Sequence, residues 1–267
     1  MSVAVASRRQ TQELAKMMAR RVAALVRPLS DTSMPVPKTD WTVGEHAAHL
    51  AYAKDVMARM LAGEPITHGT PTREGLAQAN LEALIGDSER NGAILADRIE
   101  AGVDAFCRRA GSMPPHAAAN SPVGTLSVDT YTSYVLTHLM MHGEAIARAL
   151  RKPSVVDRQS VIGAVPFICF AIEKFVDQDA VRGFTAAYAV HMRGGPTFYV
   201  TFDDGNVRVT QAPVRRIDCH ISADPVALFL VGIRMIEQWG PIATFKLTTW
   251  GPKPWLAFRF AGTFLPP

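Results

Sequence analysis

Residues 131–150 read YTSYVLTHLMMHGEAIARAL, and their pattern sets the architecture of the first half of the chain. Apolar side chains recur in this segment at helical spacing, which predicts a buried helix that ends before Pro153. His138 and His142 are four residues apart, so they lie one turn apart on the same helix face. Two imidazoles on a buried turn must be hydrogen-bonded or bound to a metal, because an unsatisfied polar group there costs about 1–3 kcal/mol. Spacing alone leaves both interpretations open.

Three more helical segments precede this one. Residues 14–25 and 81–106 carry apolar stripes at helical spacing, and a further helix is expected from the N-cap residue Thr42 to about Leu61. Four helices joined by loops predict an N-terminal, all-α, antiparallel four-helix bundle over residues 1–153. Bundles of this kind build metal sites from inward-facing side chains.

His49 lies in the second predicted helix, about ninety residues before the histidine pair. If the second and fourth helices pack side by side, His49, His138 and His142 would share one ion at about 2.0–2.1 Å, as in an open divalent-metal site. His46 lies on the same helix, and either histidine could face the interior of the bundle. Glu45 has two interpretations: it orients the second ring nitrogen of His49, or it is an acid favoured at a helix start.

After Pro153 the pattern changes from helical spacing to alternation. A bridging helical segment, residues 155–175, leads to three antiparallel strands joined by tight turns. Asp224-Pro225 is a helix start, and that helix is expected to reach about Gln238. Residues 154–267 are therefore predicted to form a smaller α+β domain. The predicted strands are residues 184–193, 198–202 and 207–209, and residues 217–221 continue the alternation.

The composition excludes several classes of protein. With 48% hydrophobic and 19% charged residues, the chain is typical of a soluble globular protein. The formal charge of +4 is not gathered into basic runs interleaved with aromatics, so nucleic-acid binding is not expected. The N-terminus lacks a secretory signal pattern, and the longest apolar run, residues 161–172, is too short to span a bilayer.

The cysteines agree with a cytoplasmic location. Cys107, Cys169 and Cys219 are few, odd in number and widely spaced, which favours a reducing compartment and buried structural thiols.

Three segments resemble a known pair of domains. Residues 41–50, WTVGEHAAHL, and residues 142–150, HGEAIARAL, are similar to motifs of the DinB-like superfamily, specifically the mycothiol-dependent maleylpyruvate isomerase N-terminal domain. Residues 250–260, WGPKPWLAFRF, with the terminal Pro266-Pro267, resemble the sterol-carrier-like (SCP2-like) domain often fused to it. The resemblance implies a DinB-like bundle followed by a smaller α+β sterol-carrier-like domain.

The resemblance also implies which residues bind the metal. The family's first histidine falls on His49 and its later one on His142. Where the isomerase has a glutamate four residues before the later histidine, this chain has His138, which restores the three-histidine set of other DinB-like proteins. The isomerase's acidic residue three positions after that histidine falls on Ala145. These departures preserve a metal site and weaken the expectation that maleylpyruvate is the substrate.

The function implied is a thiol-dependent transferase or isomerase that acts on a small electrophile at a three-histidine metal centre. Its expected cofactors are a divalent metal, zinc or alternatively nickel, and a low-molecular-weight thiol such as mycothiol. Bound hydroxide acting as the nucleophile is a competing use of the same centre. The residues do not identify a general acid or base.

A non-catalytic alternative rests on the C-terminal domain, which could bind a hydrophobic or lipid-like ligand beside a structural metal. Its aromatic residues either line a cavity or simply fill the core. They are Phe198, Phe202, Phe229, Phe258 and Phe260. The remaining histidines are expected to be ordinary surface residues: His68, His116, His191 and His220.

Overall fold

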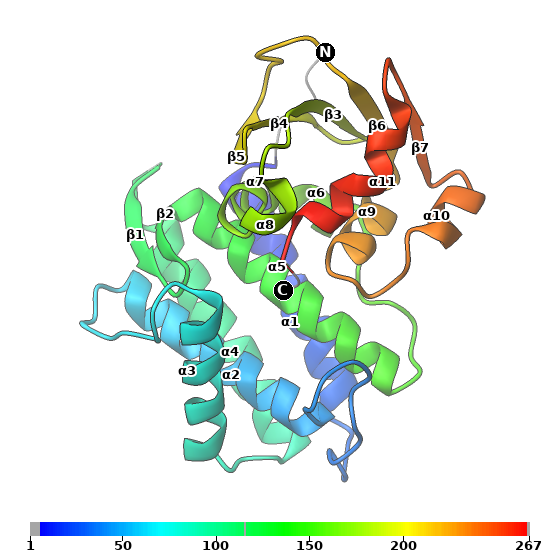
Figure 1. Cartoon of the computed structure of the whole chain (residues 1–267). Helices are drawn as coiled ribbons and strands as arrows, with labels where there is room; N and C mark the ends of the chain where they lie inside the picture. Colours follow the sequence, from blue (N-terminus) through cyan, green and yellow to red (C-terminus); the bar gives the residue numbers. More distant parts are fainter. Residues whose placement is uncertain (1–5, 115, 266–267) are drawn as a thin grey trace. The chain divides into compact units, whose positions relative to one another are not determined.

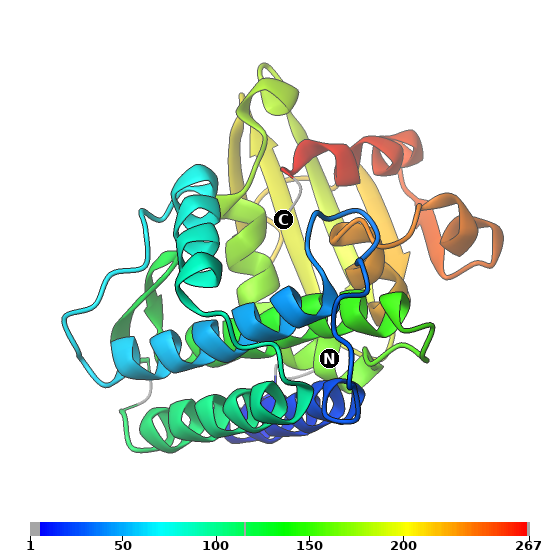
Figure 2. The same cartoon turned by 90° about the horizontal axis from the view of Figure 1, so that it is seen from below.

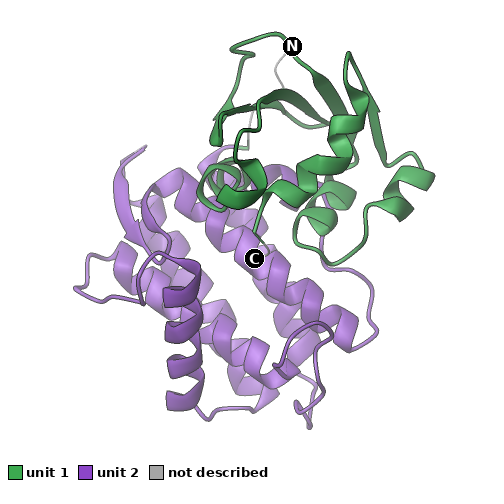
Figure 3. Cartoon of the chain, viewed as in Figure 1, with its two compact units in different colours: residues 1–6, 165–267 green, residues 7–164 purple. Residues whose placement is uncertain are grey.

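The computed structural model describes residues 6–114 and 116–265, so the terminal Pro266-Pro267 lies outside the described residues. The chain divides into two compact units (Figure 3). We call residues 7–164 the helical unit, and residues 1–6 with 165–267 the sheet unit. The division follows Ala164, later in the chain than residue 153, where the sequence pattern changes.

Four long helices of the helical unit pack against one another (Figure 1). Figure 2 shows α4 running beside α1, and both also contact α5. The predicted helical character of this half of the chain is confirmed. The helices are α1 (Arg8–Val26), α2 (Val43–Leu61), α3 (Arg73–Gly86), α4 (Gly92–Gly111), α5 (Val128–Ala149) and the short α6 (Arg158–Gly163).

The helices begin where their sequences provide capping residues. Thr42 is the N-cap of α2: its side chain accepts a hydrogen bond from the Glu45 amide, and the Glu45 carboxylate accepts one from the Thr42 amide. Ser127 caps α5 by accepting a hydrogen bond from the amide of Thr130. Such caps are worth about 1 kcal/mol each and fix where the two histidine-bearing helices start.

The third predicted helix is two helices. The apolar stripe over residues 81–106 is interrupted after Gly86, and Asn91 starts α4 by accepting hydrogen bonds from two amides of its first turn. Leu81, on α3, is 49% exposed, so it does not belong to the buried stripe of α4. The single-stripe prediction was wrong because capping by Asn91 outweighs continuity of apolar spacing.

A β-hairpin precedes α5 and was not predicted. It joins β1 (Ala118–Ser121) to β2 (Gly124–Ser127), and Gly124 at its turn has a φ of 109°, which favours glycine. These strands are only four residues long and lack the apolar alternation by which strands are recognised.

The sheet unit contains a five-stranded sheet in the order β5-β4-β3-β6-β7. Strands β3, β4 and β5 form the predicted antiparallel series, whereas β6 pairs parallel with β3 and β7 pairs antiparallel with β6. The strands are β3 (Ala186–Met192), β4 (Thr197–Asp203), β5 (Asn206–Thr210), β6 (Cys219–Ala223) and β7 (Leu247–Trp250). The sheet-containing C-terminal region is therefore confirmed.

Short helices complete the sheet unit. The helix predicted to reach Gln238 ends at Gly232, and Arg234, two residues further on, adopts a left-handed φ of 57°. Most of the aromatic residues that could have lined a cavity are buried in the core, but Phe258 is 51% exposed and stacks on Trp239. The helices are α7 (Val165–Lys174), α8 (Gln178–Val181), α9 (Pro225–Gly232), α10 (Trp239–Ala243), α11 (Ala257–Phe260) and the 3-10 turns η1 (Pro254–Leu256) and η2 (Ala261–Thr263).

In the part of the chain that the structure describes, no helix combines the length and apolar character needed to cross a membrane.

Candidate metal centre

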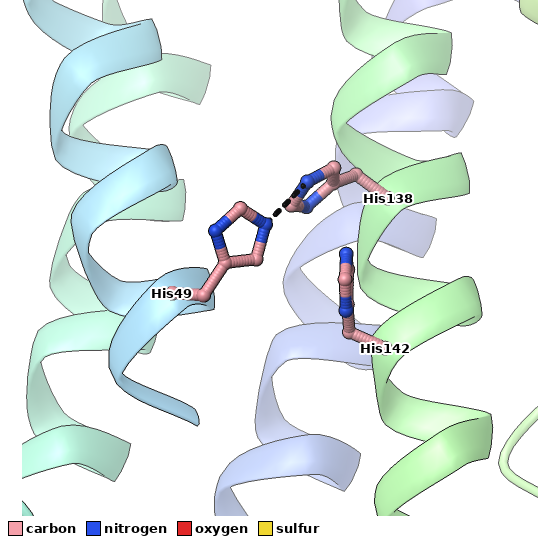
Figure 4. Close-up of side chains that lie close together, drawn as sticks. All are labelled: His49, His138 and His142. Carbon is pink, nitrogen blue, oxygen red and sulfur yellow. Dashed lines mark hydrogen bonds between the residues drawn. The ribbon is translucent and has the colours of Figure 1, made fainter. Parts of the chain in front are cut away.

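Three histidines from two helices converge inside the helical unit. Figure 4 shows His49, on α2, facing His138 and His142, on α5. Each offers one ring nitrogen, and these nitrogens lie within 4.8 Å of one another. The structure thus brings together the three residues that spacing and resemblance selected.

One pair of ring nitrogens in this cluster has a spacing that fits a shared metal ion. His49 Nε2 lies 3.1 Å from His138 Nε2. Two imidazole nitrogens bound to one zinc ion at about 2.0–2.1 Å would lie roughly 2.9–3.4 Å apart. The same separation also suits a hydrogen bond between the two rings when no ion is bound.

Burial keeps these imidazoles neutral. His49 is buried, and its desolvation lowers its pKa to about 3. Burial also lowers the pKa of His138 and of His142 well below the usual range, and protonation of Lys54 or of a neighbouring histidine would act in the same direction. Because a metal ligand must be unprotonated, this environment holds the rings in the binding form at neutral pH.

Lys54 lies fully buried next to the cluster, a position that the sequence analysis missed. Its Nζ is 3.1 Å from His138 Nδ1 and 3.3 Å from Met57 Sδ. Burial lowers the pKa of Lys54 well below its usual range. If His138 uses Nε2 as a ligand, its Nδ1 carries the proton, and a neutral Lys54 amine can accept a hydrogen bond from it.

The sequence contained a signal for Lys54. Ala47, Leu50, Met57 and Leu61 follow helical spacing along α2 and are all buried. Lys54 stands in that stripe where an apolar residue is expected.

His46 also belongs to the cluster. Its Nδ1 lies 3.0 Å from His142 Nδ1, and its Nε2 lies 3.3 Å from Thr39 Oγ1. Burial lowers the pKa of His46 to about 4. The Trp41 ring packs 5.2 Å from the His46 ring and 5.1 Å from the His49 ring. Both histidines of α2 therefore face the interior.

Glu45 does not orient His49. Its carboxylate accepts hydrogen bonds from the amide and hydroxyl of Thr42 in the cap of α2, which agrees with its interpretation as a helix-start acid. His49 Nδ1 is buried and has no hydrogen-bond partner among the described residues. Nδ1 of His138 contacts Lys54, and Nδ1 of His142 contacts His46. Nδ1 of His49 is thus the one without a partner among the three.

The other histidines match the prediction of ordinary surface residues only in part. His68 is buried, and its Nε2 lies 2.8 Å from Asn80 Oδ1, so that prediction was wrong. His116 is exposed, as expected, and pairs with Asp129. His191 and His220 meet across β3 and β6, with His191 Nε2 3.1 Å from His220 Nδ1. Trp250 stacks on both of their rings.

The cysteines carry no nucleophilic site. All three are free thiols, and burial raises the pKa of Cys107 and Cys169 to about 12 and that of Cys219 to about 11. At neutral pH each is a thiol and not a thiolate, which is the nucleophilic form.

The fold and the cluster define a class of protein: a helical domain with a buried histidine centre, followed in the chain by an α+β region with a five-stranded sheet. Over residues 15–147 the sequence matches the family described as the mycothiol maleylpyruvate isomerase N-terminal domain, so this segment of the chain belongs to that family. The matched segment includes His46, His49, Lys54, His138 and His142.

Solved structures show the same fold. The crystal structure of a mycothiol-dependent maleylpyruvate isomerase matches with a TM-score of 0.52 and 12% identity, covering 93% of this chain and 96% of that one. A histidine-to-alanine variant of the same enzyme matches with a TM-score of 0.53, the same identity and the same coverage. At this identity the likeness concerns the fold.

A third similarity is local. A UbiJ-SCP2 ubiquinone synthesis protein matches with a TM-score of 0.27 and 17% identity, over 32% of this chain and 69% of that one. No curated protein matches the sequence.

Proposed function

We propose that this protein is a metal- and thiol-dependent transferase or isomerase that acts on a small electrophile at the centre formed by His49, His138 and His142. The observation that carries this proposal is the convergence of three neutral imidazoles inside the helical unit. Membership of a family described by mycothiol and by an isomerase supports the thiol and the reaction class.

The donor set supports zinc, with nickel as the alternative, because both ions accept imidazole nitrogen. A divalent ion bound there would supply positive charge that lowers the pKa of a thiol or a water beside it. The three ligands are neutral, so none of them offsets that charge. A site of this kind favours the anionic form of a thiol more than one that includes a carboxylate ligand.

The surrounding side chains leave little of the cluster exposed to water. Trp41 packs over the α2 histidines, and the ring of Tyr134 meets that of His138 edge-on at 5.9 Å. Tyr134 and His138 are each only 9% exposed. In such surroundings electrostatic interactions are stronger than in water, which favours an anionic nucleophile beside a cation.

The proposed chemistry involves no net oxidation or reduction. In a transfer, the thiol S–H bond breaks, sulfur bonds to the electrophilic carbon, and the proton passes to the leaving group or the adjacent carbon. In an isomerisation, sulfur adds to a double bond, the resulting single bond rotates, and the S–C bond then breaks to return the thiol.

The first test is the metal content of the full-length protein purified without chelators. We expect about one divalent ion per chain, as in a mononuclear site. His138→Ala should lose the ion while its helical circular dichroism stays unchanged, and the exposed His116→Ala is the matched control that should retain it. A wild-type protein that binds no ion, even after reconstitution with zinc or nickel, would contradict the proposal.

The second test is calorimetric titration of mycothiol into metal-loaded and metal-free protein. Binding that requires the metal is the expected result. Equal heats with and without metal, or no binding to the metal-loaded protein, would argue against a thiol-dependent reaction.

A further inference from the structure

His46 is held at both of its ring nitrogens. Nδ1 lies 3.0 Å from His142 Nδ1, and Nε2 lies 3.3 Å from Thr39 Oγ1 in the loop before α2. His46 is only 3% exposed, and Trp41 covers it edge-on with an interplanar angle of 69°. A side chain so enclosed has one ring orientation.

The contact with His46 determines which nitrogen of His142 is available to the centre. Nδ1 of His142 faces His46, so Nε2 is free to point toward His49 and His138. A nitrogen that binds a metal carries no proton, so the Nδ1 of a neutral His142 must carry it and donate.

When His142 uses Nε2 as its ligand atom, the following arrangement of protons satisfies the groups in contact with its Nδ1. His142 Nδ1–H donates to His46 Nδ1, and His46 Nε2–H donates to Thr39 Oγ1. The Thr39 hydroxyl in turn donates to the Val36 carbonyl, 3.3 Å away. Each donor in this chain has an acceptor, and no charged group is required.

We propose that His46 is a positioning residue for the metal ligand His142: it accepts the Nδ1–H hydrogen bond and thereby fixes the ring orientation and tautomer that aim Nε2 at His49 and His138. The inference rests on the proposed metal centre and adds a residue to it. Metal-binding histidines generally need such a partner, which is often a carboxylate. Here the partner is an imidazole, so the support of His142 adds no negative charge to the neutral ligand set.

The contacts in the structure favour this role for His46 over His49. The two residues are three positions apart on α2, and both face inward. His49 contacts His138 through Nε2, whereas His46 contacts Nδ1 of His142. His46 also lies outside the group whose ligand nitrogens are within 4.8 Å of one another.

The test compares two substitutions in the full-length protein. His46→Leu removes the acceptor, whereas His46→Asn places an amide oxygen near the former position of Nδ1. We measure cobalt(II) and zinc affinity by chelator competition and the visible absorption of the cobalt(II) protein, with circular dichroism as a check on folding. We expect His46→Leu to weaken affinity by about 10–100-fold and to alter the cobalt spectrum, and His46→Asn to recover most of both.

Each remaining outcome is informative. Equal affinity and an unchanged spectrum in His46→Leu would overturn the role of His46 while leaving the metal centre in place. Equal losses in both substitutions would show that the hydrogen bond is not what matters, and would also overturn it. A wild-type protein with no affinity for either ion would remove the metal centre itself and this inference with it.

Thr39→Val serves if His46→Leu fails to fold. It removes the acceptor for His46 Nε2–H at a loop residue that is not one of the three ligands. We expect a smaller loss of cobalt affinity with intact folding, and an unchanged affinity would count against the proposed chain of hydrogen bonds.

Discussion

Burial of the Lys54 side chain lowers the stability of the folded state. This side chain is fully buried, and its amine contacts a histidine nitrogen and a methionine sulfur. Burial lowers its pKa well below the usual 10.5, so the folded chain gives up this proton at a lower pH than the unfolded chain does. Removing that proton on folding opposes stability.

We therefore expect Lys54→Met to stabilise the metal-free protein. The free-energy cost of removing the Lys54 proton on folding is absent above about pH 10.5. It grows by about 1.4 kcal/mol per pH unit as the pH falls toward the folded-state pKa. Denaturant unfolding of chelator-treated protein between pH 7 and pH 10 should show a gain that is largest at pH 7.

The matched control is Lys152→Met, which alters an exposed lysine after α5. Its effect should be within about 0.5 kcal/mol. If Lys54→Met destabilised the protein at pH 7, the amine would be charged and stabilised by its surroundings, contrary to this account.

The pairing of α1 with α5 depends on a glycine beside a candidate ligand. Gly143 follows His142, and a Cβ at this position would lie 2.5 Å from Val22 Cγ2 and 3.3 Å from Val155 Cγ2. Valine is stiff at its first torsion, so Val22 cannot easily turn aside. The two helices therefore approach closely because residue 143 has no side chain.

Gly143→Ala should destabilise the helical unit by about 1–3 kcal/mol, the usual range for overpacking, despite the better helix propensity of alanine. Val22→Ala removes the clashing methyl groups, so the double variant should be more stable than the sum of the two single changes predicts. Chemical denaturation of all four proteins measures this coupling, and strictly additive effects would show that the helices separate without strain.

Over the entire chain, the candidate centre belongs to one unit. His49, His138 and His142 all lie within residues 7–164. The short α6 is the last helix of this unit and packs closely against its other helices. A Cβ on Gly163 would lie 2.8 Å from Leu14 Cδ1 and 3.1 Å from Leu136 Cδ2. We therefore propose that the helical domain extends to residue 164.

Two truncated chains test this boundary. Residues 1–164 should fold and bind the metal ion about as tightly as the full chain, because every ligand is present. Residues 1–153 contain the same ligands but lack α6 and Asp157, which pairs with Arg21. We expect this fragment to be at least about 1 kcal/mol less stable, since burial of apolar surface on Leu14 and Leu136 is lost. Equal thermal stability of the two fragments would place the boundary at the earlier position.

Much of this organisation was accessible from local patterns. The spacing of His138 and His142 placed both on one helix face, Thr42 marked the start of α2, and Asp224-Pro225 marked the start of α9. Caps, prolines and apolar periodicity act over a few residues, so they can be recognised without knowledge of the fold. The failures were also local: capping by Asn91 divided an apparently continuous helix.

Contacts between distant residues could not be obtained in this way. The 3.1 Å approach of His49 to His138 joins residues 89 positions apart, and that of His191 to His220 joins two parallel strands. Such contacts depend on how whole helices and strands pack, which the sum of many small apolar burials determines. The candidate ligands could thus be identified from the sequence. Their convergence, and the contacts that His46 and Lys54 make with them, were decided by the packing of the helices.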